Sequence, residues 1–211
     1  TCALPIFLER MKKVLFFALA AFMTATVSAQ VVTSTSFKKA KSGTVWYIKA
    51  GANIANVSVD EGDDPDAIFG YNVGIAFDRP IGSNGVFWNS GLLLATKGWK
   101  YSYDGDEIKL NANKLEIPLT FGYKYKVNDD IAIDARIGGF ANYDVFGKYK
   151  EGDDSCNLGD LEDYDRFSAG IQFGIGVWYQ KLNFNITYQN GLVKQNESKE
   201  KNWMISLGYA F

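Results

Sequence analysis

Histidine is missing from this sequence of 211 residues. Its absence excludes every mechanism in which an imidazole acts as a general base or as a metal ligand. The sequence also lacks the CxxC motif of redox and metal sites, the GxSxG motif of serine hydrolases and a glycine-rich phosphate-binding loop. We therefore predict no catalytic residue, no cofactor and no metal site, and we do not expect an enzyme.

A hydrophobic run long enough for a membrane-spanning helix is absent as well. The apolar run 14–23 is too short to cross a bilayer. It follows Met11 and two lysines and precedes the small residues Val27-Ser28-Ala29, which is the pattern of a secretory signal peptide cut after Ala29. We assign residues 11–29 to that signal peptide, 1–10 to an extension upstream of the translated protein, and 30–43 to a periplasmic leader.

The sequence also has few cysteines and no excess of basic over acidic residues. Of the two cysteines, Cys2 lies in the upstream extension, so Cys156 is left without an internal disulfide partner. The 22 basic and 24 acidic side chains give a net charge of −2, which is not the basic footprint of a nucleic-acid-binding protein. Something other than disulfides must hold a secreted domain together, and the hydrogen-bond ladder of a closed barrel would do so.

The last ten residues give the clearest positive signal. Large apolar residues alternate there with small or polar ones. A period of two indicates a β-strand with one apolar face, and a tilted strand crosses a bilayer in about 9–11 residues. A chain that ends such a strand on an aromatic residue resembles a bacterial outer-membrane β-barrel, in which this residue belongs to the signal read by the barrel-assembly machinery. The apolar positions are Trp203, Ile205, Leu207, Tyr209 and Phe211.

Seven further segments alternate in the same way. The sequence therefore predicts an all-β fold, an eight-stranded antiparallel up-and-down transmembrane β-barrel over residues 44–211. We expect a bulge near 96–98, where the apolar parity changes, and a local irregularity at Pro118. The predicted strands are 46–57, 68–78, 86–97, 114–125, 131–145, 167–179, 182–192 and 202–211.

The connections between these segments alternate in length. Those at 58–67, 103–112, 147–165 and 193–201 are long, and the three between them are short. In outer-membrane barrels the short turns face the periplasm and the long loops face the outside. We therefore predict a protein of the bacterial outer membrane with both termini in the periplasm.

The glycines indicate which strand face meets the lipid. On a solvent-exposed sheet a glycine only weakens the strand, whereas in the lumen of an eight-stranded barrel it makes room. The polar face also carries mostly amides and hydroxyls rather than Lys and Glu. Both features favour a membrane barrel over a soluble lipocalin-type barrel, whose apolar face points inward. Gly139 is an exception on the apolar parity; the glycines on the polar parity are Gly51, Gly70, Gly74, Gly122, Gly138, Gly170, Gly174, Gly176 and Gly208.

Two short motifs carry a resemblance to a known family. They are Lys49-Ala50-Gly51-Ala52-Asn53 in the first predicted strand and Leu115-Glu116-Ile117-Pro118-Leu119 in the fourth. They resemble the Bacteroidetes outer-membrane β-barrel domain family, the PorT-like group, over residues 46–211. The resemblance implies an eight-stranded outer-membrane barrel of a group whose role is usually unassigned. One named relative takes part in protein export across the outer membrane, but no residue here carries that activity over.

Five charged residues fall on the polar parity and are expected to point into the lumen: Lys49, Glu116, Lys124, Asp134 and Arg136. They could fill the interior as a packed ion-pair network or line it as a selectivity filter. Eight strands leave an interior just wide enough for side chains, so we favour the network. Such a network must be nearly fully paired to be tolerated in a buried site.

Acidic residues gather in the predicted long loops, seven of them in 147–165. Clustered carboxylates are calcium ligands, but their spacing does not match an EF-hand, and Asp104-Gly105-Asp106 is only a fragment of one. We favour a solvated acidic surface, which divalent ions could bridge to lipopolysaccharide, over a specific calcium site. Cys156 lies in the same loop; we favour an incidental cysteine over one that pairs between chains.

These features predict a small closed outer-membrane barrel with a structural or interaction role through its acidic extracellular loops. The alternative is a narrow channel or a component of an outer-membrane transport or secretion complex. The expected partners are outer-membrane lipid and lipopolysaccharide, the barrel-assembly machinery and an unidentified protein partner, with no nucleic acid.

Overall fold

The computed structural model describes residues 43–59, 65–103, 106–152, 154–158, 164–193 and 198–211, all within the compact unit Ser34–Phe211. The predicted upstream extension, the signal peptide and nearly all of the leader lie outside the described residues. In the described part of the chain, no helix combines the length and the apolar character needed to cross a bilayer.

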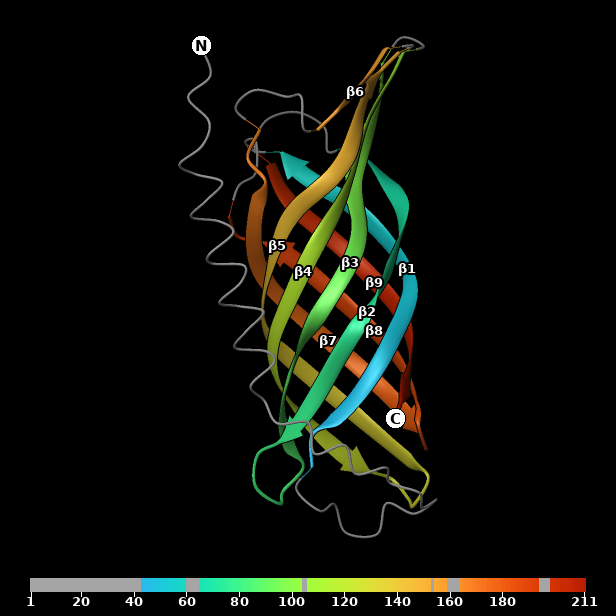
Figure 1. The fold of residues 1–211 in the computed structure, drawn as a ribbon, viewed down its shortest axis with the longest axis vertical. Helices are drawn as coiled ribbons and strands as arrows, with labels where there is room; N and C mark the ends of the chain where they lie inside the picture. Colours follow the sequence, from blue (N-terminus) through green and yellow to red (C-terminus); the bar gives the residue numbers. More distant parts are fainter. Residues whose placement is uncertain (1–42, 60–64, 104–105, 153, 159–163, 194–197) are drawn as a thin grey trace. The chain divides into compact units, whose positions relative to one another are not determined.

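Eight antiparallel strands close into a barrel, which confirms the predicted fold class (Figure 1). Each strand pairs with the next one along the chain, β5 pairs with β7, and β1 pairs with β9 to close the ring. A short extra strand, β6 (Asp154–Asn157), pairs with the far end of β5. The barrel strands are β1 (Val45–Val59), β2 (Asp66–Pro80), β3 (Val86–Tyr103), β4 (Asp106–Lys126), β5 (Ile131–Glu151), β7 (Phe167–Tyr179), β8 (Leu182–Gly191) and β9 (Ser198–Ala210).

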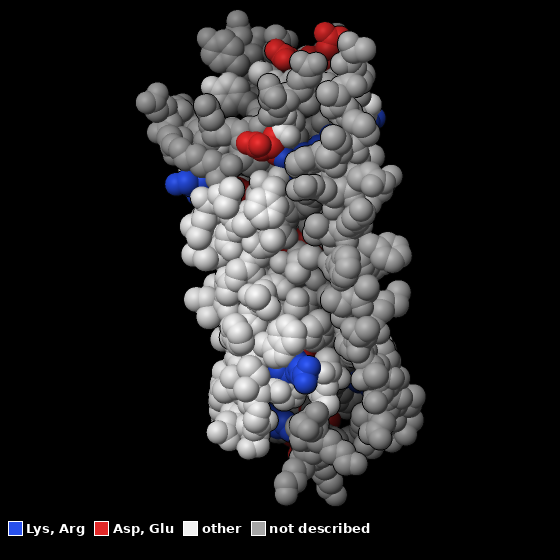
Figure 2. Space-filling view, turned by 60° about the vertical axis from the view of Figure 1, so that its left-hand side comes forward, with Lys and Arg blue, Asp and Glu red and all other residues white. Residues whose placement is uncertain are grey.

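The apolar rows face outward and the polar rows face the lumen, as predicted. In β9, for example, Ile205 and Leu207 are exposed on the outside, whereas Asn202 and Ser206 are buried in the interior. Figure 2 shows uncharged side chains across the middle of the barrel, with the coloured charged side chains toward its two ends. An exposed apolar belt with a polar interior is the arrangement of a barrel whose solvent is lipid.

The lumen-facing glycines lie where strands approach closely. A Cβ added to Gly51 would run into the backbone carbonyl of Ile205 on the neighbouring strand, and one added to Gly138 would run into that of Leu119. Real Cβ atoms do not tolerate such contacts, so these positions require the smallest residue. The glycines therefore allow eight strands to curl into a narrow ring, as their parity predicted.

Four strands extend at least four residues farther than the sequence predicted. β9 begins at Ser198, so the predicted loop 193–201 is partly strand. β3 continues to Tyr103, β4 begins at Asp106 and β5 continues to Glu151, so the predicted loop 103–112 is wrong and the predicted loop 147–165 is partly strand. Figure 1 shows β3, β4 and β5 rising past their neighbours at the top of the view, with β6 beside β5. Outside the bilayer no lipid selects apolar residues, so the alternation that marks a spanning strand fades. We call residues 98–103, 106–112, 147–151 and 154–157 the extension.

The predicted bulge near 96–98 lies on a different strand. The pairing of β3 with β4 runs from Leu93↔Glu116 to Tyr103↔Asp106 without a shift. The register shift opposite these residues is instead in β2, between Ala67 and Asn72, where β2 carries the extra residue. A second shift lies in the pairing of β4 with β5, between Asn113 and Lys114. The parity change at Trp99 follows from β3 leaving the lipid belt, so the residues above the belt are no longer sorted by lipid contact.

Pro118 interrupts one ladder without changing its register, as expected of a residue that lacks an N–H. The pairing of β3 with β4 passes from Ser90↔Leu119 directly to Leu93↔Glu116. The Ser90 hydroxyl donates a hydrogen bond of 2.8 Å to the Pro118 carbonyl oxygen. The side chain thus replaces part of the missing ladder, and the predicted irregularity is confirmed.

Candidate functional site

The candidate site is the lumen of the barrel, where the five charged residues singled out in the sequence lie. Glu116, Asp134 and Arg136 are buried, Lys124 is mostly buried, and Lys49 lines an internal cavity. The structure therefore confirms that all five point inward. Four of them belong to two layers of ion pairs, and Lys49 lines the small cavity between these layers.

The lower layer lies near the short turns and contains two ion pairs. Arg136 binds Asp134 with 2.7 Å between Nη2 and Oδ1, and Lys124 binds Asp78 with 2.8 Å between Nζ and Oδ2. The Trp178 indole N–H donates to the second oxygen of Asp134 at 2.7 Å. Opposite charges thus neutralise one another inside the barrel, which a low-dielectric interior requires.

Aromatic side chains complete the lower layer. The Lys124 ammonium lies 4.0 Å from the centroid of the Trp178 ring, within the range of a cation–π contact. The Phe87 ring lies beside both Lys124 and Arg136. Tyr47 packs edge-on against Trp178, and both are almost fully buried. These rings fill the space around the charges at the short-turn end of the lumen.

Neighbouring glycines make room for the Asp134–Arg136 pair. The register places Gly176 opposite Asp134 and Gly174 opposite Arg136. A Cβ on Gly176 would lie 2.7 Å from the Asp134 Oδ2 atom, and one on Gly174 would lie 3.1 Å from the Arg136 Cγ atom. A larger residue at Gly174 or Gly176 would therefore collide with the side chains of the ion pair.

The upper layer lies toward the extension and forms a chain of four ion pairs. Lys97 contacts Glu116 and Glu200, each at 2.7 Å. Lys114 contacts Glu200 at 3.3 Å and Asp144 at 3.1 Å. The amide of Gln189 joins the network because it accepts from Lys97 and donates to Glu116. The result is a continuous polar layer across the lumen.

Tyr164 closes the upper layer from the side of the connection between β6 and β7. Its hydroxyl donates a hydrogen bond of 2.7 Å to the Asp144 Oδ2 atom. Burial and the neighbouring Asp144 carboxylate raise the pKa of the Tyr164 phenol well above its usual value. The phenol therefore keeps its proton, and its hydrogen bond to Asp144, throughout the physiological pH range.

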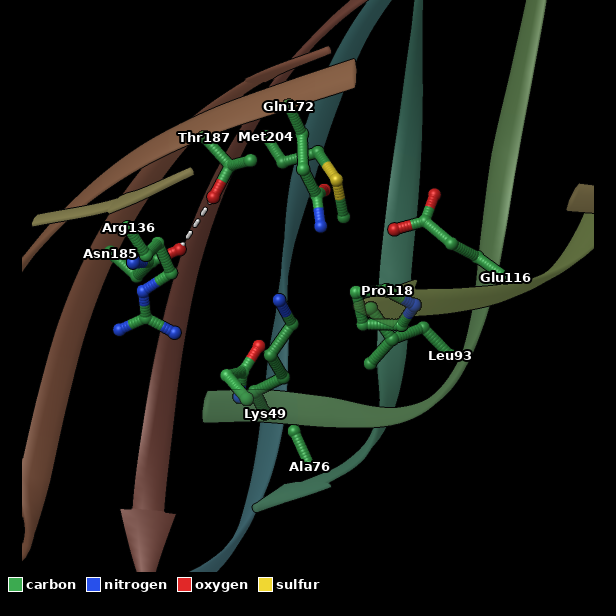
Figure 3. Close-up of a pocket in the computed structure, with 11 residues that line it drawn as sticks. Lys49, Ala76, Leu93, Glu116, Pro118, Arg136, Gln172, Asn185, Thr187 and Met204 are labelled. Carbon is green, nitrogen blue, oxygen red and sulfur yellow. Dashed lines mark hydrogen bonds between the residues drawn. The ribbon is translucent and has the colours of Figure 1, made fainter. Parts of the chain in front are cut away.

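A cavity of about 10 Å³ separates the two layers. Figure 3 shows the Lys49 side chain reaching into it from β1, with Glu116 on one side and Gln172 and Met204 above. The cavity is large enough for about one water molecule. Among the described residues Lys49 makes no ion pair, so the predicted network is not complete at this position.

Sequence reasoning named four of the nine residues that form these ion pairs and missed the other five, which are Asp78, Lys97, Lys114, Asp144 and Glu200. Asp78 and Lys97 lie on the polar parity of their strands, and that parity could have identified them. Glu200 lay in a segment predicted as a loop, so no parity could be assigned to it. The pairing partners themselves come from different strands, and single-sequence periodicity contains no information about such contacts.

The acidic loops of the sequence are described only in part. In the described part of the chain, no group of three or more Asp, Glu or Cys residues could hold a metal ion. Asp60, Glu61, Asp104 and several acids of 147–165 lie outside the described residues. Cys156 lies in β6 opposite Tyr149 and not in a loop, and it is half-buried.

Residues 29–195 match the model of the family described as outer membrane protein beta-barrel domain. The chain belongs to this family. It is therefore a small β-barrel protein of the bacterial outer membrane, as its sequence predicted. The rule for this class places the short turns, the start of β1 and the end of β9 on the periplasmic side, with the extension outside.

Several solved outer-membrane barrels are similar to this chain. Ail of Yersinia pestis, in complex with the heparin analogue sucrose octasulfate, is 16% identical with a TM-score of 0.46, covering 80% of this chain and 99% of Ail. Neisserial surface protein A is 15% identical with a TM-score of 0.48, covering 80% and 99%. OprG from Pseudomonas aeruginosa is 12% identical with a TM-score of 0.44, covering 81% and 97%. No curated protein matches this chain.

Proposed function

We propose that this protein is a closed barrel that acts through its extracellular surface, as a structural or interaction protein and not as an enzyme. The observation that carries the proposal is the filled lumen. Two layers of ion pairs occupy the interior, and the cavity between them has room for about one water molecule. A barrel filled in this way meets its partners on its outer surface.

Planar-bilayer recording tests the closed lumen. The full chain, folded in detergent and reconstituted at high protein density, should leave the membrane conductance at the level of protein-free bilayers. Steady single-channel steps that scale with protein concentration would contradict the proposal. A known open porin, reconstituted in parallel, controls for insertion.

The alternative is a narrow channel or a component of a transport complex, and Lys49 is the observation in its favour. The Lys49 ammonium faces an internal cavity and has no ion-pair partner in the described part of the chain, so it could act on a passing ion. If the lumen conducts, Lys49→Glu should reverse the ion selectivity. If conductance is absent in both proteins, mild cross-linking in native outer membranes, followed by purification, would reveal a protein partner instead.

We infer that the barrel-assembly machinery reads the C-terminal end of β9. Phe211 is 65% exposed, and its N–H donates to the Trp46 carbonyl oxygen at 3.1 Å, which holds the last residue beside β1. Phe211→Ala should reduce barrel assembly in cells while leaving refolding in detergent unchanged. Equal losses in both assays would indicate a packing role instead.

We also propose that residues 11–29 act as a signal peptide and that the chain falls in the PorT-like group of Bacteroidetes. The small residues before Gln30 and the two strand motifs support these assignments. N-terminal sequencing of the protein from isolated outer membranes should give Gln30 as the first residue. A mature protein that begins elsewhere would overturn the predicted cleavage site.

A further inference from the structure

Four lysines gather on the outer surface of the extension. The register pairs Lys100 of β3 with Lys109 of β4, and Lys109 with Lys150 of β5, so three lysines form one row across three strands. Lys148 lies in the adjoining row. Lys148 and Lys150 are exposed, and Lys100 and Lys109 are half-buried. We call these four residues the lysine cluster.

The lysine cluster is unfavourable for the protein alone. Directly opposed residues of antiparallel strands have their Cβ atoms about 4.5–5.5 Å apart, and like charges at that distance destabilise a sheet. At one end of the first row, the exposed carboxylate of Asp66 on β2 lies opposite Lys100. The other positions of the two rows are Gly98, Asn111, Ser155 and Asn157, so Lys109, Lys148 and Lys150 have no carboxylate opposite them. Glu107 is 3.9 Å from Lys100, but it is half-exposed, and such a pair contributes little. An anion bound between the lysines would remove this repulsion.

The cluster lies directly above the apolar belt. Thr96, Asn113 and Phe146 form the row that ends the belt; the phenol of Tyr71 donates to Asn113 there at 3.0 Å. Phe146 is 53% exposed on the lipid side. Alternate residues share a strand face, so the lysines two and four residues farther along face the same way as Phe146. At about 3.3 Å per residue, they lie about 7–13 Å along the strands beyond the belt.

We propose that the lysine cluster binds the phosphate groups of outer-leaflet glycolipids of the lipid A class. The distance from the belt matches the headgroup region, which begins where the hydrocarbon ends. A lysine ammonium group is a point charge that binds phosphate. Each lysine near an anionic lipid surface strengthens the binding of the protein to that surface. Asn111 and Ser155 supply neutral hydrogen-bonding groups beside the charges. The proposal goes beyond the closed-lumen function and holds whether or not the lumen conducts.

Thermal unfolding with and without lipid A tests this assignment. The full chain, folded in detergent micelles, is titrated with diphosphorylated lipid A, and unfolding is followed by tryptophan fluorescence. Lipid A should raise the unfolding temperature of the wild type. The variant with Lys100, Lys109, Lys148 and Lys150 all replaced by Gln should bind at least about tenfold more weakly. Without lipid A it should melt no lower than the wild type, because the repulsion between Lys109 and Lys150 is gone and the exposed pairs of Lys100 with Asp66 and Glu107 contribute little.

Matched variants and ligands separate the cluster from other effects. Lys126→Gln with Lys181→Gln removes two lysines at the opposite, short-turn end and should leave lipid A binding unchanged. Lys109→Gln alone, in the middle of the row, should weaken binding and serves if the four-fold variant does not fold. Dephosphorylated lipid A should give no gain in unfolding temperature.

Three results would overturn the assignment. Lipid A binding that survives the four-fold substitution would exclude the cluster as the site. Binding abolished by EDTA would indicate a divalent ion bridging carboxylates to the lipid, not direct lysine contacts. Inorganic phosphate or sucrose octasulfate that protects the wild type as well as lipid A at equal concentration would indicate a soluble anion as the ligand.

Discussion

Lys97 and Glu116 form an ion pair of 2.7 Å in which the two side chains are 0% and 1% exposed. The same ammonium also contacts Glu200 at 2.7 Å, so one cation serves two buried carboxylates. Burial removes the water that would otherwise solvate these groups, and each charge then depends on its partner. Removing the shared cation should therefore cost more stability than removing the charge of one of the two acids.

Lys97→Met should destabilise the barrel more than Glu116→Gln. Loss of Lys97 leaves Glu116 without a cation and Glu200 with Lys114 alone, and should lower the free energy of unfolding by about 3–5 kcal/mol. Loss of the Glu116 charge leaves Lys97 paired with Glu200 and should cost less. Urea unfolding in detergent micelles measures both. Equal losses in the free energy of unfolding would show that the second contact of Lys97 does not contribute to stability.

Arg136→Ala should reduce stability without opening the lumen. It leaves the buried Asp134 carboxylate with the Trp178 indole but without its cation, at a cost of roughly 3 kcal/mol. Lys49→Met is the control, because it removes a lumen charge that has no ion-pair partner among the described residues, and it should leave stability unchanged or higher. Urea midpoints and bilayer conductance of both variants provide the measurement. Large new channels with unchanged unfolding in Arg136→Ala would contradict the packed network.

Gly176→Ala should destabilise the barrel, whereas Gly139→Ala should not. A Cβ on Gly176 would lie 2.7 Å from Asp134 Oδ2, and overpacking at such a site costs about 1–3 kcal/mol. A Cβ on Gly139, on the lipid side, would have Gly170 O as its nearest neighbour at 3.4 Å, an ordinary contact. Thermal unfolding of the two proteins compares them directly. If both substitutions were neutral, the steric dependence between the ion pair and its glycines would be refuted.

Ile137→Arg should impair insertion into a bilayer. Ile137 is 65% exposed on the outer face in the middle of β5, and an arginine at the centre of the lipid face of a barrel costs about 2–4 kcal/mol. Val127→Arg, in the short turn after β4, places the same charge outside the belt and should be tolerated. Refolding yields into lipid vesicles distinguish them. Wild-type yield for Ile137→Arg would be incompatible with a lipid-facing row.

The sequence predicted the spanning parts of the fold well because lipid selects one strand face. Strand β7 has the predicted limits, Phe167 and Tyr179, and both faces are assigned correctly. The extension was missed because residues such as Lys109 and Lys148 are held in strands by pairing, with no lipid to sort their faces. β6 is four residues long and has no pattern that a single sequence can reveal.

The candidate site could be predicted as a location but not as a set of contacts. Parity alone placed Asp134 and Arg136 in the lumen. Two residues apart on one strand, they bind each other, whereas Lys124 reaches across to Asp78 on β2. Which partner a lumen charge takes depends on register and on shear between strands distant in the chain. That information is absent from local periodicity.

The pairing of β1 with β9 runs from Tyr47↔Ala210 to Val59↔Ser198, so the first and last strands form the seam of the ring. Until β9 is synthesised and delivered, β1 has an unpaired edge whose amide groups hydrocarbon cannot solvate. Completion of the barrel must therefore follow translation, and the nascent chain needs an escort across the periplasm. A truncation that removes β9 should yield a polypeptide that periplasmic proteases destroy, not a smaller barrel.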